Sequence, residues 1–163
     1  MNWYDKISDA LEVDDYSPLL NAIDYYENQL VIARKEVLME GNLEKMAASL
    51  PGIVEYRYSQ LQEIEAVLEL FNIKLSKEKG LKFREYLEHY NRALSSRDAE
   101  KYAEAESSII DIQLLINQIA LIRNKYLAIF KGLENKSFQI NNITKLRTAG
   151  FEDTELRNIY IPK

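Results

Sequence analysis

The sequence has no cysteine and only one histidine, five glycines and three prolines among its 163 residues. Without cysteine, disulfides, thiolate metal sites and a cysteine nucleophile are excluded. With His89 as the single histidine, a catalytic triad would have only that residue to use as its base. The sequence also lacks a Gly-x-Ser-x-Gly elbow and a glycine-rich phosphate loop. We therefore predict that the protein is not an enzyme and uses no cofactor.

A metal site is also not predicted. Carboxylate sites in helical bundles use two Glu-x-x-His units, whereas this chain has a single Glu85-x-x-x-His89 with a different spacing. A carboxylate-based enzyme would need bound metal in the purified protein, and we keep it only as a third alternative to the two functions described below.

Signals for membranes and export are missing as well. The longest apolar run, 109–122, is interrupted by polar residues, and the first residues carry neither a basic region nor an apolar stretch. A spanning helix needs about 20 apolar residues, and a secretory signal needs both of those missing features. The sequence therefore predicts a soluble cytoplasmic protein with no membrane partner.

The scarcity of glycine and proline also predicts the fold class. Evenly spaced turn residues of the kind that β-hairpins need do not occur, so we expect an all-α protein. The few glycines and prolines of the chain mark helix ends, because proline is favoured in the first turn of a helix and glycine just after its last turn. We predict four segments: a helix from Ser17-Pro18 to Gly41, a short helix at 43–49, a long helix from Leu50 to Leu94 that is straight or kinked at Gly80, and a last long helix from Ser95 to Gly150.

The last helix has the most regular apolar pattern. Its apolar residues recur at steps of three and four, which is a heptad seam of the kind that packs helices together. Two long antiparallel helices are too thin to bury both of their faces alone. We therefore predict an elongated, antiparallel, coiled-coil-like bundle that forms a homo-oligomer through its C-terminal helices. The residues that we assign to oligomerisation are Ile109, Ile112, Ile116, Ile119, Tyr126, Phe130, Leu133 and Ile140.

Charge is unevenly distributed along the chain. The net charge of -5 opposes a protein that coats nucleic acid through bulk positive charge. Residues 74–84, which we call the basic segment, nevertheless carry five cations against Glu78 alone. Cations beside aromatic side chains can hold single-stranded nucleic acid through phosphate contacts and base stacking, although a solvated helix face gives the same pattern. The candidate DNA-binding residues are Lys74, Lys77, Lys79, Lys82, Arg84, Tyr86 and Tyr90.

Helix geometry limits how these cations act together. Helical residues two apart point about 200° away from each other. Lys82 and Arg84 therefore face one strand only if Gly80 distorts the helix or if neighbouring subunits each contribute one of them.

The chain divides into three predicted regions: an acidic N-terminal helical region at 1–49, a long-helix core at 50–150 and a C-terminal tail at 151–163. Residues 1–50 hold ten acids and four bases. This stretch either mimics nucleic acid toward a basic partner or is a solvated helix that keeps an oligomer soluble. The tail carries an apolar patch, Ile159-Tyr160-Ile161, which packs either on the bundle or on another subunit.

Two stretches of the chain resemble the UvsY-like recombination mediators of large tailed phages. Leu81-Lys82-Phe83-Arg84, followed by an acid and a tyrosine, is similar to the Leu-Lys-x-Arg element of that family. Residues 135–143 are similar to its basic, aromatic, Ile-containing C-terminal stretch, and Ala149-Gly150 falls where members end. The resemblance covers roughly residues 50–152.

The resemblance implies a non-enzymatic, all-helical protein of DNA recombination and repair. Members form rings through their C-terminal helices, bind single-stranded DNA and help a phage recombinase displace the single-strand binding protein. The family's DNA contact carries over to Lys82 and Arg84, and to those two residues alone. An alternative that the sequence leaves open is a helical structural assembly or adaptor protein of a phage particle, built by the same heptad face.

Overall fold

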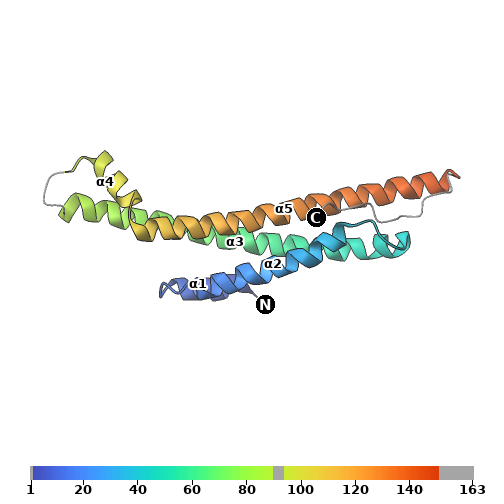
Figure 1. The fold of residues 1–163 in the computed structure, drawn as a ribbon, viewed down its shortest axis with the longest axis horizontal. Helices are drawn as coiled ribbons and strands as arrows, with labels where there is room; N and C mark the ends of the chain where they lie inside the picture. Colours follow the sequence, from blue (N-terminus) through green and yellow to red (C-terminus); the bar gives the residue numbers. More distant parts are fainter. Residues whose placement is uncertain (1, 90–93, 151–163) are drawn as a thin grey trace. The chain divides into compact units, whose positions relative to one another are not determined.

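The structure, a computed structural model, describes residues 2–89 and 94–150 and has five helices in that part of the chain (Figure 1). They are α1 (Trp3–Leu11), α2 (Ser17–Val37), α3 (Leu43–His89), α4 (Ser96–Glu104) and α5 (Ser107–Thr148). No strand occurs among the described residues, and the helices confirm the all-α fold class. The predicted C-terminal tail and its apolar patch lie outside the described residues.

Capping side chains determine where several helices begin. Ser95 is the N-cap of α4, as the sequence predicts, and its hydroxyl accepts a hydrogen bond from the backbone N–H of Asp98 at 3.2 Å. Ahead of α3, the side chain of Asn42 accepts from the backbone N–H of Lys45 at 3.0 Å. Each such cap is worth about 1 kcal/mol, because the first N–H groups of a helix have no partner inside it.

The two glycines that were expected to end helices adopt the left-handed conformation that glycine favours. Gly41 has a φ of +90° and Gly150 a φ of +81°. α5 ends two residues before Gly150, at Thr148, as expected. α2 ends earlier than expected, at Val37, so that Gly41 lies in the turn that leads to α3.

The predicted helix boundary at residue 50 is wrong. α3 begins at Leu43 and continues through Pro51, which we had placed in the first turn of a new helix. A proline inside a helix removes a hydrogen bond and costs about 3 kcal/mol. The first turns of α3 offset this cost by burying Met46 and Leu50, which are 7% and 6% exposed. The boundary predicted between 49 and 50 therefore falls inside a helix.

The last predicted helix is in fact two helices, α4 and α5, which are bent by 61° relative to each other. At the break, the N–H of Glu106 bonds to the carbonyl of Ala103 at 3.3 Å, three residues back. The carbonyl of Glu106 then accepts from the N–H of Ile110 at 3.0 Å, which starts the α5 hydrogen bonding. The break lets α4 bury its own small face, since Ala99 and Ala103 are 0% and 2% exposed.

By its contacts the chain divides into two compact units, each assembled from two distant stretches. The first unit comprises Met1–Ile23 and Glu63–Arg123, and the second comprises Asp24–Gln62 and Asn124–Lys163. The units therefore cut across the predicted regions 1–49 and 50–150.

In the first unit, hydrogen bonds to Glu63 of α3 hold the start of α1. The carboxylate of Glu63 accepts hydrogen bonds from the backbone N–H groups of Trp3 and Tyr4, the latter at 3.3 Å, at the start of α1, where backbone N–H groups have no carbonyl acceptor inside the helix. The core of this unit is made of the buried apolar residues Trp3, Ile7, Leu11, Leu19, Ala22, Ile64, Val67, Phe71, Ala99, Ala103, Ile109, Ile112, Ile116, Ile119 and Ile122.

The second unit buries two cations beside α2. Arg57 is 2% exposed and donates to both carboxylate oxygens of Glu36, from Nε at 2.7 Å and from a terminal nitrogen at 2.8 Å. Lys136 Nζ donates to the backbone carbonyls of Glu36 and Leu38, each at 2.7 Å, at the end of α2. These bonds satisfy buried polar groups that would otherwise destabilise the core.

The heptad seam that we assigned to oligomerisation lies in the core of a single chain. Phe130 is half-buried, and its ring contacts that of Tyr58 at a centroid distance of 5.4 Å. α2 and α3 thus supply, within one chain, the partner faces that we expected from other copies, and self-association stays a prediction that would need another surface. The remaining seam residues are buried, at 7% exposure or less: Ile109, Ile112, Ile116, Ile119, Tyr126, Leu133 and Ile140.

Candidate nucleic-acid interface

The basic segment lies in the C-terminal half of α3, within the first unit, and α3 is helical throughout it. The helix continues through Gly80, where an added Cβ would meet nothing within 4 Å. Since the segment stays helical, Lys82 and Arg84 point about 200° apart and do not share a face. The pair that the family resemblance singled out is therefore not brought together within one chain.

Three of the five cations in the basic segment are held by carboxylates. Lys74 Nζ contacts Asp14 at 2.6 Å and Glu78 at 3.2 Å, and its side chain is 17% exposed. The hydrogen bond that Lys74 donates to Asp14 is the largest cause that raises the pKa of Lys74 above its usual value. Lys74 therefore stays charged, but its charge is largely compensated.

The other two paired lysines are more exposed. Lys79 Nζ lies 3.1 Å from a carboxylate oxygen of Glu104 on α4, and Lys82 Nζ lies 2.9 Å from Glu85 on its own helix. The Glu85 hydrogen bond is the main cause that raises the pKa of Lys82. Exposed ion pairs of this kind are weak, so both lysines can exchange their carboxylate for another anion.

Lys77 and Arg84 are exposed, and neither makes an ion pair within the described part of the chain. They are seven residues apart on a continuous helix, so their directions differ by only about 20°. Leu81, which is 50% exposed, lies on the same face between them. This face of α3, which we call the Lys77–Arg84 face, is the part of the basic segment most open to a phosphate backbone.

The aromatic residues expected to stack on bases are engaged elsewhere or not described. The hydroxyl of Tyr86 donates a hydrogen bond to the carboxylate of Glu106, which raises the pKa of Tyr86. Its ring lies against that of Tyr102 at a centroid distance of 5.7 Å. Tyr90 lies outside the described residues. Tyr86 is therefore less available for base stacking than we predicted from the sequence.

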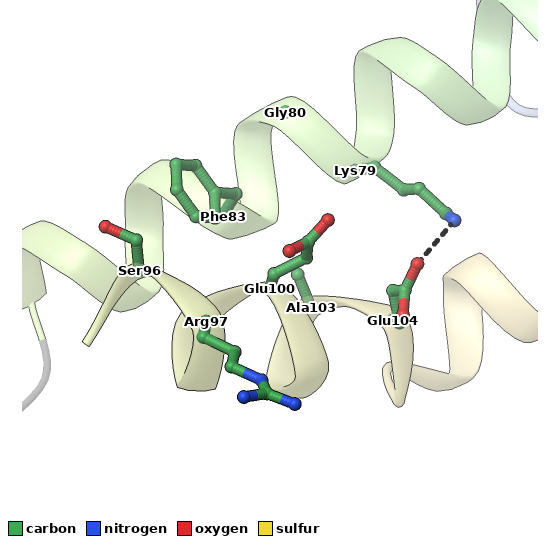
Figure 2. Close-up of a pocket in the computed structure, with 8 residues that line it drawn as sticks. All are labelled: Lys79, Gly80, Phe83, Ser96, Arg97, Glu100, Ala103 and Glu104. Atoms are coloured by element: carbon green, nitrogen blue, oxygen red, sulfur yellow. Dashed lines mark hydrogen bonds and ion pairs between the residues drawn. The ribbon is translucent and has the colours of Figure 1, made fainter. Parts of the chain in front are cut away.

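Figure 2 shows a pocket between α3 and α4 with a volume of about 510 Å³. Phe83 and Ala103 give it an apolar lining, and the ion pair between Lys79 and Glu104 lies at one end. Sequence reasoning missed Arg97, an exposed cation on α4 that belongs to this pocket, because only the packing of α4 on α3 brings it near the basic segment. The residues that line the pocket are Lys79, Gly80, Phe83, Ser96, Arg97, Glu100, Ala103 and Glu104.

Residues 2–89 and 94–150 hold no group of three or more His, Cys, Asp or Glu residues that could bind a metal ion. Among the described helices, none by itself is long and apolar enough to cross a membrane, whereas α4 and α5 pass that test together as a bent pair.

Comparison of the chain with protein-family models, curated proteins and solved structures gives no match. The resemblance to UvsY-like mediators therefore rests on the sequence motifs alone, and the function has to be argued from the interface itself.

Chemically, the interface offers cations and few other reactive groups. Lys77 and Arg84 can bind phosphates directly, and Lys79 and Lys82 can do so after losing a carboxylate partner. Guanidinium and ammonium groups on one helix face neutralise phosphates without reading base sequence. The arrangement suits a sequence-independent contact with a nucleic-acid backbone.

Proposed function

We propose that this protein is a recombination mediator that binds single-stranded DNA and helps to load a phage recombinase onto strands covered by single-strand binding protein. The observation that carries the proposal is the Lys77–Arg84 face, where two exposed cations share one side of α3 and pair with no carboxylate of residues 2–89 and 94–150. The resemblance of residues 81–84 and 135–143 to UvsY-like mediators supports the same function.

In this proposal, Lys77 and Arg84 contact phosphates of one strand from the same face of α3. One such site is modest on a chain with a net charge of -5. A homo-oligomeric ring would repeat the site in every subunit, and linked weak contacts bind far more tightly than one. The proposed partners are single-stranded DNA, the recombinase and the single-strand binding protein, in the cytoplasm of the host cell.

The proposal is tested by fluorescence anisotropy of a labelled single-stranded oligonucleotide across a salt series. Each phosphate neutralised on a single strand contributes about -0.7 to the slope of log affinity against log salt. We expect Lys77→Ala with Arg84→Ala to weaken binding and to flatten the slope by about 1.4, for two lost contacts.

The matched control removes the same two kinds of charge from an exposed position on α2, as Arg34→Ala with Lys35→Ala. We expect this control to bind like the parent protein. Equal losses in both double variants would show a general effect of net charge, and no loss in either would show that the Lys77–Arg84 face does not bind DNA.

A second candidate function is a helical assembly or adaptor protein of a phage particle. It is favoured by apolar side chains that α5 leaves exposed in the first unit: Ile110 at 47%, Leu114 at 55% and Leu121 at 56%. Recurrence at steps of four and seven places them on one face of α5, which suits contact with another protein. Absence of DNA binding at low salt, together with assembly through this face, would favour this candidate.

A further inference from the structure

The structure shows acidic groups from other elements bound to the basic segment. Asp14, which lies between α1 and α2, contacts Lys74, and Glu104 at the end of α4 contacts Lys79. Glu106, just after α4, accepts the hydrogen bond of Tyr86. The carboxylates of Glu104 and Glu106 thus contact Lys79 and Tyr86, two residues that we predicted to bind DNA.

The ion pair between Lys79 and Glu104 is the one that DNA could most readily displace. The two side chains are 37% and 53% exposed, so solvent weakens their attraction. Lys74, by contrast, is 17% exposed and held by two carboxylates. Carboxylate and phosphate oxygens accept the same charge-assisted hydrogen bonds from an ammonium group, so they compete directly for Lys79.

The position of Glu104 suggests that its charge does not stabilise α4. Glu104 is the last residue of that helix, where the negative end of the helix dipole disfavours a carboxylate. The nearest stabilising partner shown for this carboxylate is Lys79 itself. Its charge therefore acts on the basic segment more than on its own helix.

We propose that Glu104 is an internal competitor for phosphate at Lys79, and that α4 thereby lowers the affinity of the protein for single-stranded DNA. This inference rests on the proposed function and requires the bound strand to pass around α3 to Lys79, which points about 200° away from Lys77. While Glu104 holds Lys79, a phosphate cannot bind there, and the Glu104 carboxylate also repels the polyanion. Removal of the Glu104 charge eliminates both the competition and the repulsion.

The competition has a characteristic salt dependence. The slope counts the phosphates that the protein neutralises, because each of them releases cations condensed on the strand. While Glu104 holds Lys79, this lysine neutralises no phosphate. A lysine freed from its carboxylate adds a full phosphate contact, and the slope of log affinity against log salt then steepens by about 0.7. Simple removal of a distant negative charge changes affinity without adding a contact.

The test compares Glu104→Gln with Glu27→Gln in the oligonucleotide titration. Glu27 pairs with Lys125 at 2.8 Å in the second unit, and the exposures of that pair, 33% and 53%, match those of Lys79 and Glu104. Both variants remove one negative charge from an equivalent ion pair. Thermal unfolding of each variant checks that the fold is retained.

We expect Glu104→Gln to bind about two- to fivefold more tightly, the range for one exposed ion pair, with a slope steeper by about 0.7. Glu27→Gln should match the parent protein. Adding Lys79→Ala to Glu104→Gln should return the slope to the parent value, which would identify Lys79 as the freed cation. Binding by Glu104→Gln where the parent protein shows none would also support the inference.

Other results would overturn the proposed competition by Glu104, and they distinguish it from the proposed function. If the parent protein binds and Glu104→Gln binds equally well, or if both Gln variants gain equally, the internal competition is refuted while the proposed function stands. If the parent protein and both variants fail to bind at low salt, the proposed function is refuted and the inference falls with it.

Discussion

At Gly132, α5 approaches α2 so closely that an added Cβ would force Val37 to shift. An added Cβ would lie 2.8 Å from Cγ1 of Val37, closer than real Cβ contacts come. A glycine inside a helix costs about 1 kcal/mol relative to alanine. At this position the close packing of the second unit offsets that cost, although the sequence pattern shows only a glycine within a helix.

We expect Gly132→Ala to destabilise the protein by about 1–2 kcal/mol, because overpacking outweighs the gain in helix propensity. Gly52→Ala is the matched control, since its new Cβ would meet nothing within 4 Å and should stabilise α3 by about 0.5–1 kcal/mol. Urea unfolding measures both free energies. Equal stabilisation by the two substitutions would contradict the close approach of Val37.

Buried Lys136 makes the stability of the protein depend on pH. Burial lowers the pKa of its ammonium group below the usual value, so the unfolded chain keeps this proton to higher pH than the folded chain does. Stability therefore increases with pH between the folded pKa and the unfolded value of about 10.4. Relative to Lys136→Met, the parent protein should gain stability across this window.

At about pH 7, Lys136→Met should itself be less stable by about 1–2 kcal/mol, because the carbonyls of Glu36 and Leu38 lose a donor. Urea unfolding at several pH values up to about 10 checks both statements. Lys35→Met, on an exposed part of α2, is the control. A gap between parent and Lys136→Met that narrows with rising pH would contradict the assigned effect of burial.

The helix α4 depends strongly on its ends, because a nine-residue helix is marginal by itself. We expect Ser95→Ala to weaken α4 by about 1 kcal/mol, since the cap on the N–H of Asp98 is lost. Amide hydrogen exchange in α4 should become about fivefold faster, while the buried middle of α5 is unchanged. Ser96→Ala, one residue into the helix, is the control and should leave exchange as it is.

The elements also show where sequence patterns mislead. Proline marks a helix start only on average, and Pro51 is retained inside α3 because the turns before it bury Met46 and Leu50. The expected helix from Ser95 to Gly150 was correct at both of its ends. Its break at Glu106 was not expected, because the acids and alanines there are good helix formers and only packing against α3 favours the bend.

Self-association is a property of the whole molecule, and we expect the exposed apolar side chains of α5 to mediate it. We expect Leu114→Ser with Leu121→Ser to reduce the molecular mass found by sedimentation equilibrium, because these side chains are more than half exposed. Ile116→Ala, in the buried seam, should instead lower the free energy of unfolding by about 2–4 kcal/mol and leave the mass unchanged. Loss of assembly in the seam variant alone would restore the original assignment.

The sequence by itself determined that this protein is all-α, where α2 and α4 begin, and which residues of α5 are apolar and regularly spaced. These properties follow from local propensity, capping and periodicity, which act over a few residues. Only the tertiary structure decided that the heptad seam packs inside one chain and that Glu104 and Asp14 hold cations of the basic segment. Those outcomes depend on which distant faces meet, because a charge or an apolar stripe has the same sequence pattern whether it faces solvent or another helix.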